Sequence, residues 1–169
     1  ADKKPYTFHL RKNAAWSNGD PVTSADFVYS WRRVLEPTTA ADYASQLYII
    51  RGARDFSEGK VTDFSAVGVR AVDARTLEVV LENPTPFFID LCAFPTLSPV
   101  HEATLRKHDT AWVKPENLVC NGPYLISEWL LDDRITLTKN PSYWDAAAVA
   151  MRTIDVMPVS DSNTALNYF

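Results

Sequence analysis

Residues 6–31, YTFHLRKNAAWSNGDPVTSADFVYSW, decide the fold of this chain because they specify a strand, a turn and a helix in succession. Residues 6–10 alternate apolar and polar side chains, which predicts a half-buried β-strand. Asn18-Gly19 predicts a turn, since both residues tolerate a positive φ. Thr23 is the expected N-cap of a helix over residues 24–35, and Asp26 follows three residues later, as in a capping box.

The rest of the chain predicts a mixture of hairpins and helices. Two hairpins are expected, one over residues 67–72 and 76–82 and one over residues 123–131 and 134–139, with a final strand at residues 153–159. Helices are expected at residues 42–54 and 100–107, directly after Pro84-Thr85-Pro86, and, unfinished, after Ser160. This pattern predicts a mixed α/β fold with a mixed or antiparallel sheet and flanking helices.

Composition places the chain among ordinary globular proteins. It has 169 residues, of which 46% are hydrophobic and 22% are charged, enough for one domain or one domain plus part of a second. The net charge of −4 argues against a nucleic-acid partner. No apolar run approaches the ~18–20 residues that cross a bilayer. Cys92 and Cys120 are too few for a disulfide scaffold, and their pairing is left open.

No constellation of residues predicts catalysis, a metal or a cofactor. His9, His101 and His108 have no metal-binding spacing such as HExxH, and His101 and His108 are expected on one short helix. The chain lacks a GxSxG elbow, a Walker loop and a GxGxxG motif. Asp132-Asp133 is interpreted as a solvent-facing turn. The chain is therefore not expected to be an enzyme.

The sequence of residues 6–31 resembles that of the periplasmic oligopeptide-binding proteins of bacterial ABC importers, which form extracellular solute-binding protein family 5. Their pattern runs W/Y-T-F-x-L-R and then W-x-D/N-G-x-P-V-T-A-x-D-F-V-Y-S-W, from which this chain departs mainly at Ser24. Further family motifs follow in order at residues 35–37, 43–45 and 68–79, at Pro99-Val100 and Trp112, and at Asn121-Gly122-Pro123-Tyr124 and Asn140-Pro141-x-Tyr143-Trp144.

The resemblance implies a type II periplasmic-binding-protein-like fold, of which this chain is an internal fragment. Residues 1–110 would be mostly the accessory domain, and residues 111–169 the remainder of that domain and an incomplete segment returning to the first lobe. The implied function is capture of short peptides by a periplasmic or extracytoplasmic membrane-anchored protein that serves the membrane subunits of an ABC importer. A related solute (a dipeptide, murein peptide, nickel chelate or oligosaccharide) and a non-solute interaction module stay open.

Tyr43 is the expected ligand-binding residue. It follows the loop at residues 38–42 and matches a family tyrosine that reaches the bound peptide. The residues alone leave a packing role at a helix start equally open. A ligand role predicts that its ring is partly exposed. Trp31, in contrast, continues the apolar stripe of its helix and is expected in the core.

Overall fold

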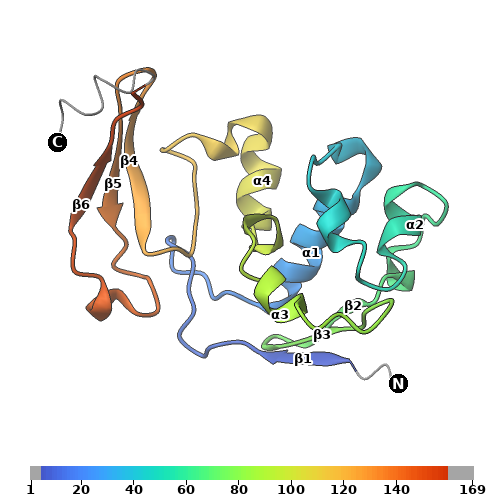
Figure 1. The fold of residues 1–169 in the computed structure, drawn as a ribbon. Coiled ribbons are helices and arrows are strands. Elements are labelled where there is room, and N and C mark those ends of the chain that lie inside the picture. Colours follow the sequence, from blue (N-terminus) through green and yellow to red (C-terminus); the bar gives the residue numbers. More distant parts are fainter. Residues whose placement is uncertain (1–4, 160–169) are drawn as a thin grey trace. The chain divides into compact units, whose positions relative to one another are not determined.

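The computed structural model describes residues 5–159, which form two compact units. The first unit comprises residues 5–14 and Val22–Glu102, and the second comprises residues 15–21 and the chain from Ala103 onward (Figure 1). The unfinished helix expected after Ser160 lies outside the described residues. Each unit contains its own antiparallel sheet, so the mixed α/β prediction is confirmed.

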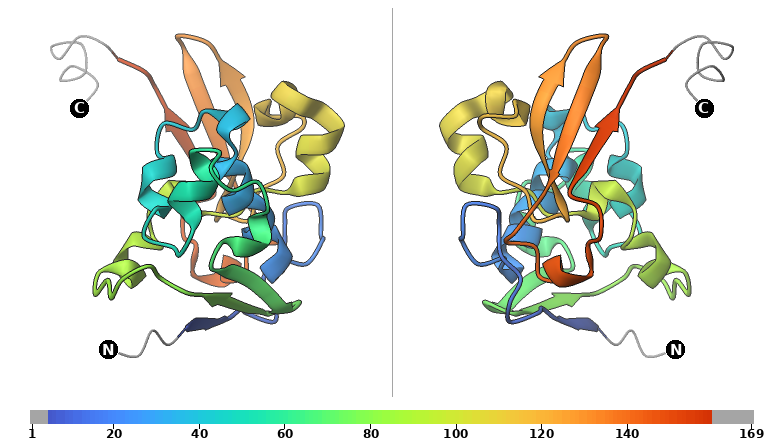
Figure 2. Two further views of the ribbon diagram at one scale, coloured as in Figure 1. Left: turned by 90° about the vertical axis from the view of Figure 1, so that its right-hand side faces the viewer. Right: turned by 90° about the vertical axis from the view of Figure 1, so that its left-hand side faces the viewer.

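The sheet of the first unit has three strands, β1 (Tyr6–His9), β2 (Val69–Asp73) and β3 (Thr76–Val79), in the order β1-β3-β2. The hairpin of β2 and β3 is the predicted one. The first strand adds to it by pairing Tyr6 with Val79 and His9 with Thr76. Figures 1 and 2 show helix α1 packed over this sheet.

Helix α1 (Ser24–Leu35) begins and ends where the sequence predicts. Its capping box is formed, since the Asp26 carboxylate accepts a 2.6 Å hydrogen bond from the backbone N–H of Thr23. Trp31 and Leu35 are buried, as the apolar stripe requires. The Trp31 indole Nε1–H donates a 2.9 Å hydrogen bond to the Leu97 carbonyl, which satisfies the one polar atom of the ring inside the core.

The core of the first unit lies between α1 and the sheet. Its buried members come from β2, β3, the helices and the loops between them, and Tyr6 and Phe8 of β1 pack against them. They are Trp31, Leu35, Leu47, Ile50, Ala53, Phe56, Val67, Val69, Leu77, Val79, Leu81, Phe88 and Leu97.

The prediction of a single helix over residues 42–54 is wrong. The chain instead forms a short 3₁₀ helix (Ala44–Leu47), a turn segment with an isolated β-bridge at Ile50, and helix α2 (Ala53–Ser57). In this turn segment the Arg51 N–H donates to Val80 and the Ile49 carbonyl accepts from Glu82, so these backbone groups bond to the segment after β3. Gly52, at φ 71°, then redirects the chain into α2.

Two further helices follow. Helix α3 (Phe88–Leu91) begins after Pro84-Thr85-Pro86 as predicted. Helix α4 (Glu102–His108) is close to its predicted range. His101 lies just before α4 and is buried, whereas His108 is its last residue, so the expectation that both histidines lie on one helix is wrong.

The second unit contains the other predicted hairpin and final strand. Strands β4 (Tyr124–Leu130), β5 (Arg134–Lys139) and β6 (Thr153–Val156) form an antiparallel sheet in that order. The turn between β4 and β5 contains Asp132 at a φ of 58°, a conformation that Asp tolerates better than most residues. Figures 1 and 2 show the three strands side by side.

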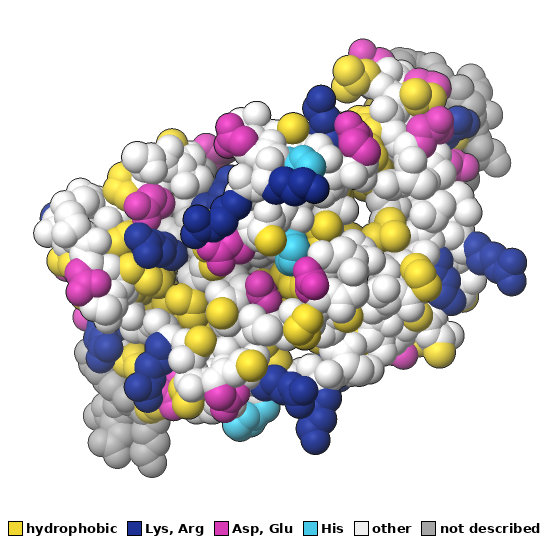
Figure 3. All heavy atoms as spheres, turned by 180° about the vertical axis from the view of Figure 1, so that it is seen from behind, with side chains coloured by type: hydrophobic (Ala, Val, Ile, Leu, Met, Phe, Trp, Pro, Cys, Tyr) yellow, Lys and Arg dark blue, Asp and Glu magenta, His cyan; other side chains and the backbone are white. Residues whose placement is uncertain are grey.

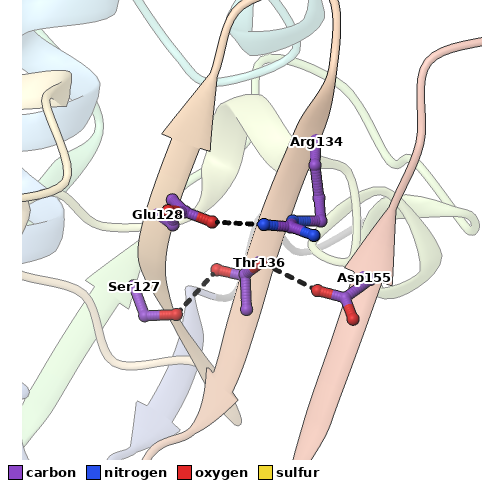
Figure 4. A network of polar contacts seen from close by, with 5 residues as sticks. All are labelled: Ser127, Glu128, Arg134, Thr136 and Asp155. Atoms are coloured by element: carbon purple, nitrogen blue, oxygen red, sulfur yellow. Dashed lines mark hydrogen bonds and ion pairs between the residues drawn. The ribbon is translucent and has the colours of Figure 1, made fainter.

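This second sheet has one apolar and one polar face. A bulge at Ser127 sets the register, and paired residues share a face. The apolar face carries Ile126, Trp129, Ile135, Leu137, Ile154 and Val156. On the polar face Arg134 forms a 3.0 Å ion pair with Glu128, and the Thr136 hydroxyl donates a 2.7 Å hydrogen bond to Asp155 (Figure 4).

Candidate functional site

Tyr43 lies in the first unit, directly before the 3₁₀ helix Ala44–Leu47. Its side chain is 56% exposed, so the predicted exposure is confirmed and a core role is excluded. Its ring meets that of Phe94 edge to face, with the centroids 5.3 Å apart and the planes at 69°. Within residues 5–159 no hydrogen-bond partner of the Tyr43 hydroxyl is recorded, which leaves this group available to a ligand.

The Phe94 ring packs against the Tyr43 ring and supports it. It is half-buried and packs against the core of the first unit. Tyr43 is therefore held by a ring that is itself fixed, while most of its own surface faces solvent. A flat apolar face next to a free hydroxyl suits contact with a peptide, because it offers both van der Waals area and a hydrogen bond.

A groove of about 500 Å³ lies in the same unit. Ser45, two residues after Tyr43, lines it, as do Tyr48, Arg54 and Glu82. The Arg54 guanidinium lies 5.1 Å from the centre of the Tyr48 ring, and the Glu82 carboxylate accepts a 3.3 Å hydrogen bond from the Gly52 N–H. Arg54 and Glu82 are thus already engaged with neighbouring groups of the wall.

The two cysteines are free. Cys92 directly follows α3, and burial raises the pKa of its thiol. A raised pKa keeps the thiol mostly protonated at neutral pH, so it reacts more slowly than an ordinary exposed cysteine.

The part of the chain that the structure describes holds no group of three or more His, Cys, Asp or Glu side chains able to bind a metal. Asp132 and Asp133 are exposed at the hairpin turn, as interpreted from the sequence.

Within residues 5–159, no helix has the length and hydrophobicity that a membrane span requires.

Asn140, which belongs to one of the family motifs, has a structural role whose partners the sequence did not reveal. It is fully buried, and its side-chain amide donates a 2.8 Å hydrogen bond to the Gly122 carbonyl. Its backbone N–H donates to the Pro123 carbonyl at 2.9 Å. Asn140 thereby ties the Asn121-Gly122-Pro123-Tyr124 motif to the end of β5. Gly122 itself has no positive φ and open space around its Cβ position, so this turn does not require a glycine.

Charged side chains of both signs are interspersed on the face drawn in Figure 3, with hydrophobic side chains between them. Several of the described pairs are exposed contacts between neighbours, such as Lys60 with Glu58 at 2.6 Å and Arg70 with Glu78 at 2.6 Å. This mixed surface accords with the small net charge of −4.

Comparison with known proteins gives a consistent result along the chain. Residues 1–169 match the family described as bacterial extracellular solute-binding proteins, family 5 Middle. The periplasmic oligopeptide-binding protein OppA of Escherichia coli is 42% identical over 172 residues, which cover 99% of this chain and 31% of that protein. The probable deoxycholate-binding periplasmic protein YgiS of the same organism is 40% identical over 168 residues, 98% of this chain and 31% of the relative.

Solved structures show the same fold. OppA of Burkholderia pseudomallei superposes with a TM-score of 0.94 at 37% identity, covering 98% of this chain and 33% of that one. Haemophilus influenzae OppA, in complex with RPPGFSPFR, gives a TM-score of 0.94 at 38% identity, with the same coverage. The chain thus spans about a third of the length of the proteins that it matches.

Proposed function

Since the chain belongs to the bacterial extracellular solute-binding proteins of family 5, we propose that the full-length protein captures short peptides outside the cytoplasm for an ABC importer. The observation that carries this proposal is the 42% identity to an oligopeptide-binding protein over 99% of the chain. A solved relative at 38% identity holds a peptide, which supports the same class of ligand. The ligand is bound and released without chemical change.

Tyr43 is the residue of this chain that we propose to contact the peptide. Its exposed ring supplies apolar area, and its hydroxyl supplies a hydrogen bond for a peptide backbone group. Most of the affinity would come from peptide backbone hydrogen bonds, salt bridges to the peptide termini, and enclosure as lobes close around the ligand. Such contacts tolerate many side chains, which suits a transporter of mixed peptides.

The proposal extends to location and organisation. The protein would act in the periplasm or as an extracytoplasmic membrane-anchored protein, and it would deliver its ligand to the membrane subunits of the importer. Residues 1–110 would form most of the accessory domain, and residues 111–169 would lead back to the first lobe.

A different solute is the second candidate. The relative named as a probable deoxycholate-binding protein is 40% identical, almost as similar as the oligopeptide-binding one. One fold serves ligands of different chemistry in such families, so identity alone does not choose between a peptide and a steroid acid.

The deciding experiment is mass spectrometry of the ligands that co-purify with the full-length protein. We expect a mixture of short peptides of varied sequence. Calorimetry of the ligand-free protein with mixed tri- to pentapeptides, and separately with deoxycholate, then gives the two affinities. Recovery of a non-peptide solute, together with tighter binding of deoxycholate than of any peptide, would reject peptide capture.

A further inference from the structure

A small apolar cavity lies within the first unit, apart from Tyr43. Its volume is about 110 Å³, and α1, β1, β3 and the segment after α3 supply its walls. The lining includes Phe8, Phe27, Trp31, Leu77, Cys92 and Leu97. The seventh lining residue is Leu10, directly after β1. The other six belong to the hydrophobic core or pack against it, so the core builds most of the cavity wall.

The cavity presents almost no polar atom. The only nitrogen of the Trp31 side chain is already bonded to the Leu97 carbonyl at 2.9 Å, which removes both a donor and an acceptor from the wall. The Cys92 thiol is a weak donor, and burial raises its pKa, so it stays neutral. A water molecule needs two to four polar partners to occupy a buried site, and this lining does not offer them.

An empty space of this kind leaves the surrounding side chains without van der Waals partners on one side. Apolar cavities of on the order of 150 Å³ in other proteins stay dry and bind benzene or xenon. Phe8, Phe27 and Cys92 are only half-buried, so part of the wall is reachable from solvent. The cavity therefore combines an apolar lining, a volume close to that of one ring, and access.

We propose that this cavity is a binding site for a small apolar molecule of about one aromatic ring. The proposal is independent of peptide capture, because none of the seven lining residues is Tyr43 or Phe94. The groove beside Ser45 is larger, but Arg54 and Glu82 in its walls already contact the Tyr48 ring and the Gly52 N–H.

The first test is titration of the purified protein with benzene, followed by NMR through the Trp31 indole N–H resonance. We expect a saturable shift. Phenol is the matched comparison, since it adds one hydroxyl that the lining cannot satisfy, and it should bind about tenfold more weakly. Absence of a saturable shift up to the solubility limit of benzene, or equal affinity for phenol, would overturn the proposal.

The second test uses the cysteines. Saturating benzene should slow alkylation of Cys92 by iodoacetamide severalfold and leave Cys120, which is not among the residues that line the cavity, unchanged. Cys92→Leu extends a side chain into the cavity and should weaken benzene binding, whereas Cys120→Leu should not. If Cys92→Leu does not fold, the alkylation rates of the unaltered protein decide, and equal rates with and without benzene at Cys92 count against the site.

Discussion

At the scale of single residues, the Tyr43 ring is held by Phe94 on one side and exposed to solvent on the other. This arrangement leads to a prediction for peptide binding. Tyr43→Ala in the full-length protein should weaken peptide binding by roughly 1–2 kcal/mol, the range of a contributing aromatic contact. Its effect on the free energy of unfolding should be small because the ring is mostly exposed. Trp31→Ala should instead cost roughly 3–5 kcal/mol of stability, because Trp31 is buried in the core.

Calorimetry with short peptides and urea unfolding of each variant measure these effects. Phe87→Ala serves as a control for Tyr43→Ala, since Phe87 is an equally exposed aromatic residue of the same unit. Unchanged affinity of Tyr43→Ala, or an equal loss in Phe87→Ala, would remove Tyr43 from the proposed site.

Phe94 should act on the ligand only through Tyr43. Its edge-to-face contact orients the Tyr43 ring, and such aromatic pairs contribute about 0.5–1.5 kcal/mol. Phe94→Leu should therefore weaken peptide binding by up to about that amount. In a Tyr43→Ala background the same change should have no effect on affinity. A double-mutant cycle measures this coupling, and additive losses would show that Phe94 acts independently.

At the scale of elements, Gly68 holds the turn at Arg51 against the segment that follows β3. Its N–H donates to Arg51 at 2.8 Å, its carbonyl accepts from Val80 at 2.7 Å, and a Cβ atom would stand only 2.5 Å from the Val80 carbonyl oxygen. Gly68→Ala should therefore lower the free energy of unfolding by about 1–3 kcal/mol. Denaturant unfolding measures this change.

Gly122→Ala is the matched control for that substitution. No atom lies within 4 Å of a Cβ at Gly122, and its φ is not positive, so stability should change by no more than about 0.5 kcal/mol. A large loss in Gly122→Ala, or none in Gly68→Ala, would contradict the steric explanation.

The same elements show what the sequence could reveal. Both hairpins and α1 were predictable because turn residues, a capping box and apolar periodicity act over a few neighbouring residues. Residues 42–54 were misread since Leu47 and Ile50 are buried at helical spacing, yet the backbone at Ile49 and Arg51 bonds to residues about thirty positions away. The bond of Asn140 to Gly122 is also nonlocal, and no local pattern indicates it.

For the candidate site, the sequence predicted Tyr43 and the exposure of its ring, but it did not predict the Phe94 ring that packs against it. Phe94 is about fifty residues further along the chain, and only the packing of α3 and the following turn brings its ring to Tyr43. The apolar cavity was likewise hidden, because it depends on how four separate segments fill space and not on any single motif.

At the scale of the whole molecule, this chain corresponds to only part of the length of its relatives, and this limits what it can bind by itself. The chain spans 31% of the length of its oligopeptide-binding relative, so an enclosed site would need other parts of the protein. The 169-residue chain by itself should therefore not bind short peptides tightly. Calorimetry with mixed tri- to pentapeptides tests this, with the full-length protein as positive control. Micromolar or tighter binding by the chain alone would contradict it.

The two-faced sheet of β4, β5 and β6 has a practical consequence for the isolated chain. Trp129 and Val156 on its apolar face are each 45% exposed, and within residues 5–159 the outer edges of β4 and β6 pair with no further strand. Exposed apolar surface beside unpaired edges promotes self-association. The chain should therefore brighten the dye 8-anilinonaphthalene-1-sulfonate and scatter light increasingly with concentration.

Trp129→Lys should reduce both signals, whereas Thr138→Lys, which adds the same charge to the opposite face, should reduce them far less. Equal reductions would assign the effect to net charge and not to the face. The exposed apolar face of this sheet would thus set the solubility limit of the chain when it is handled alone.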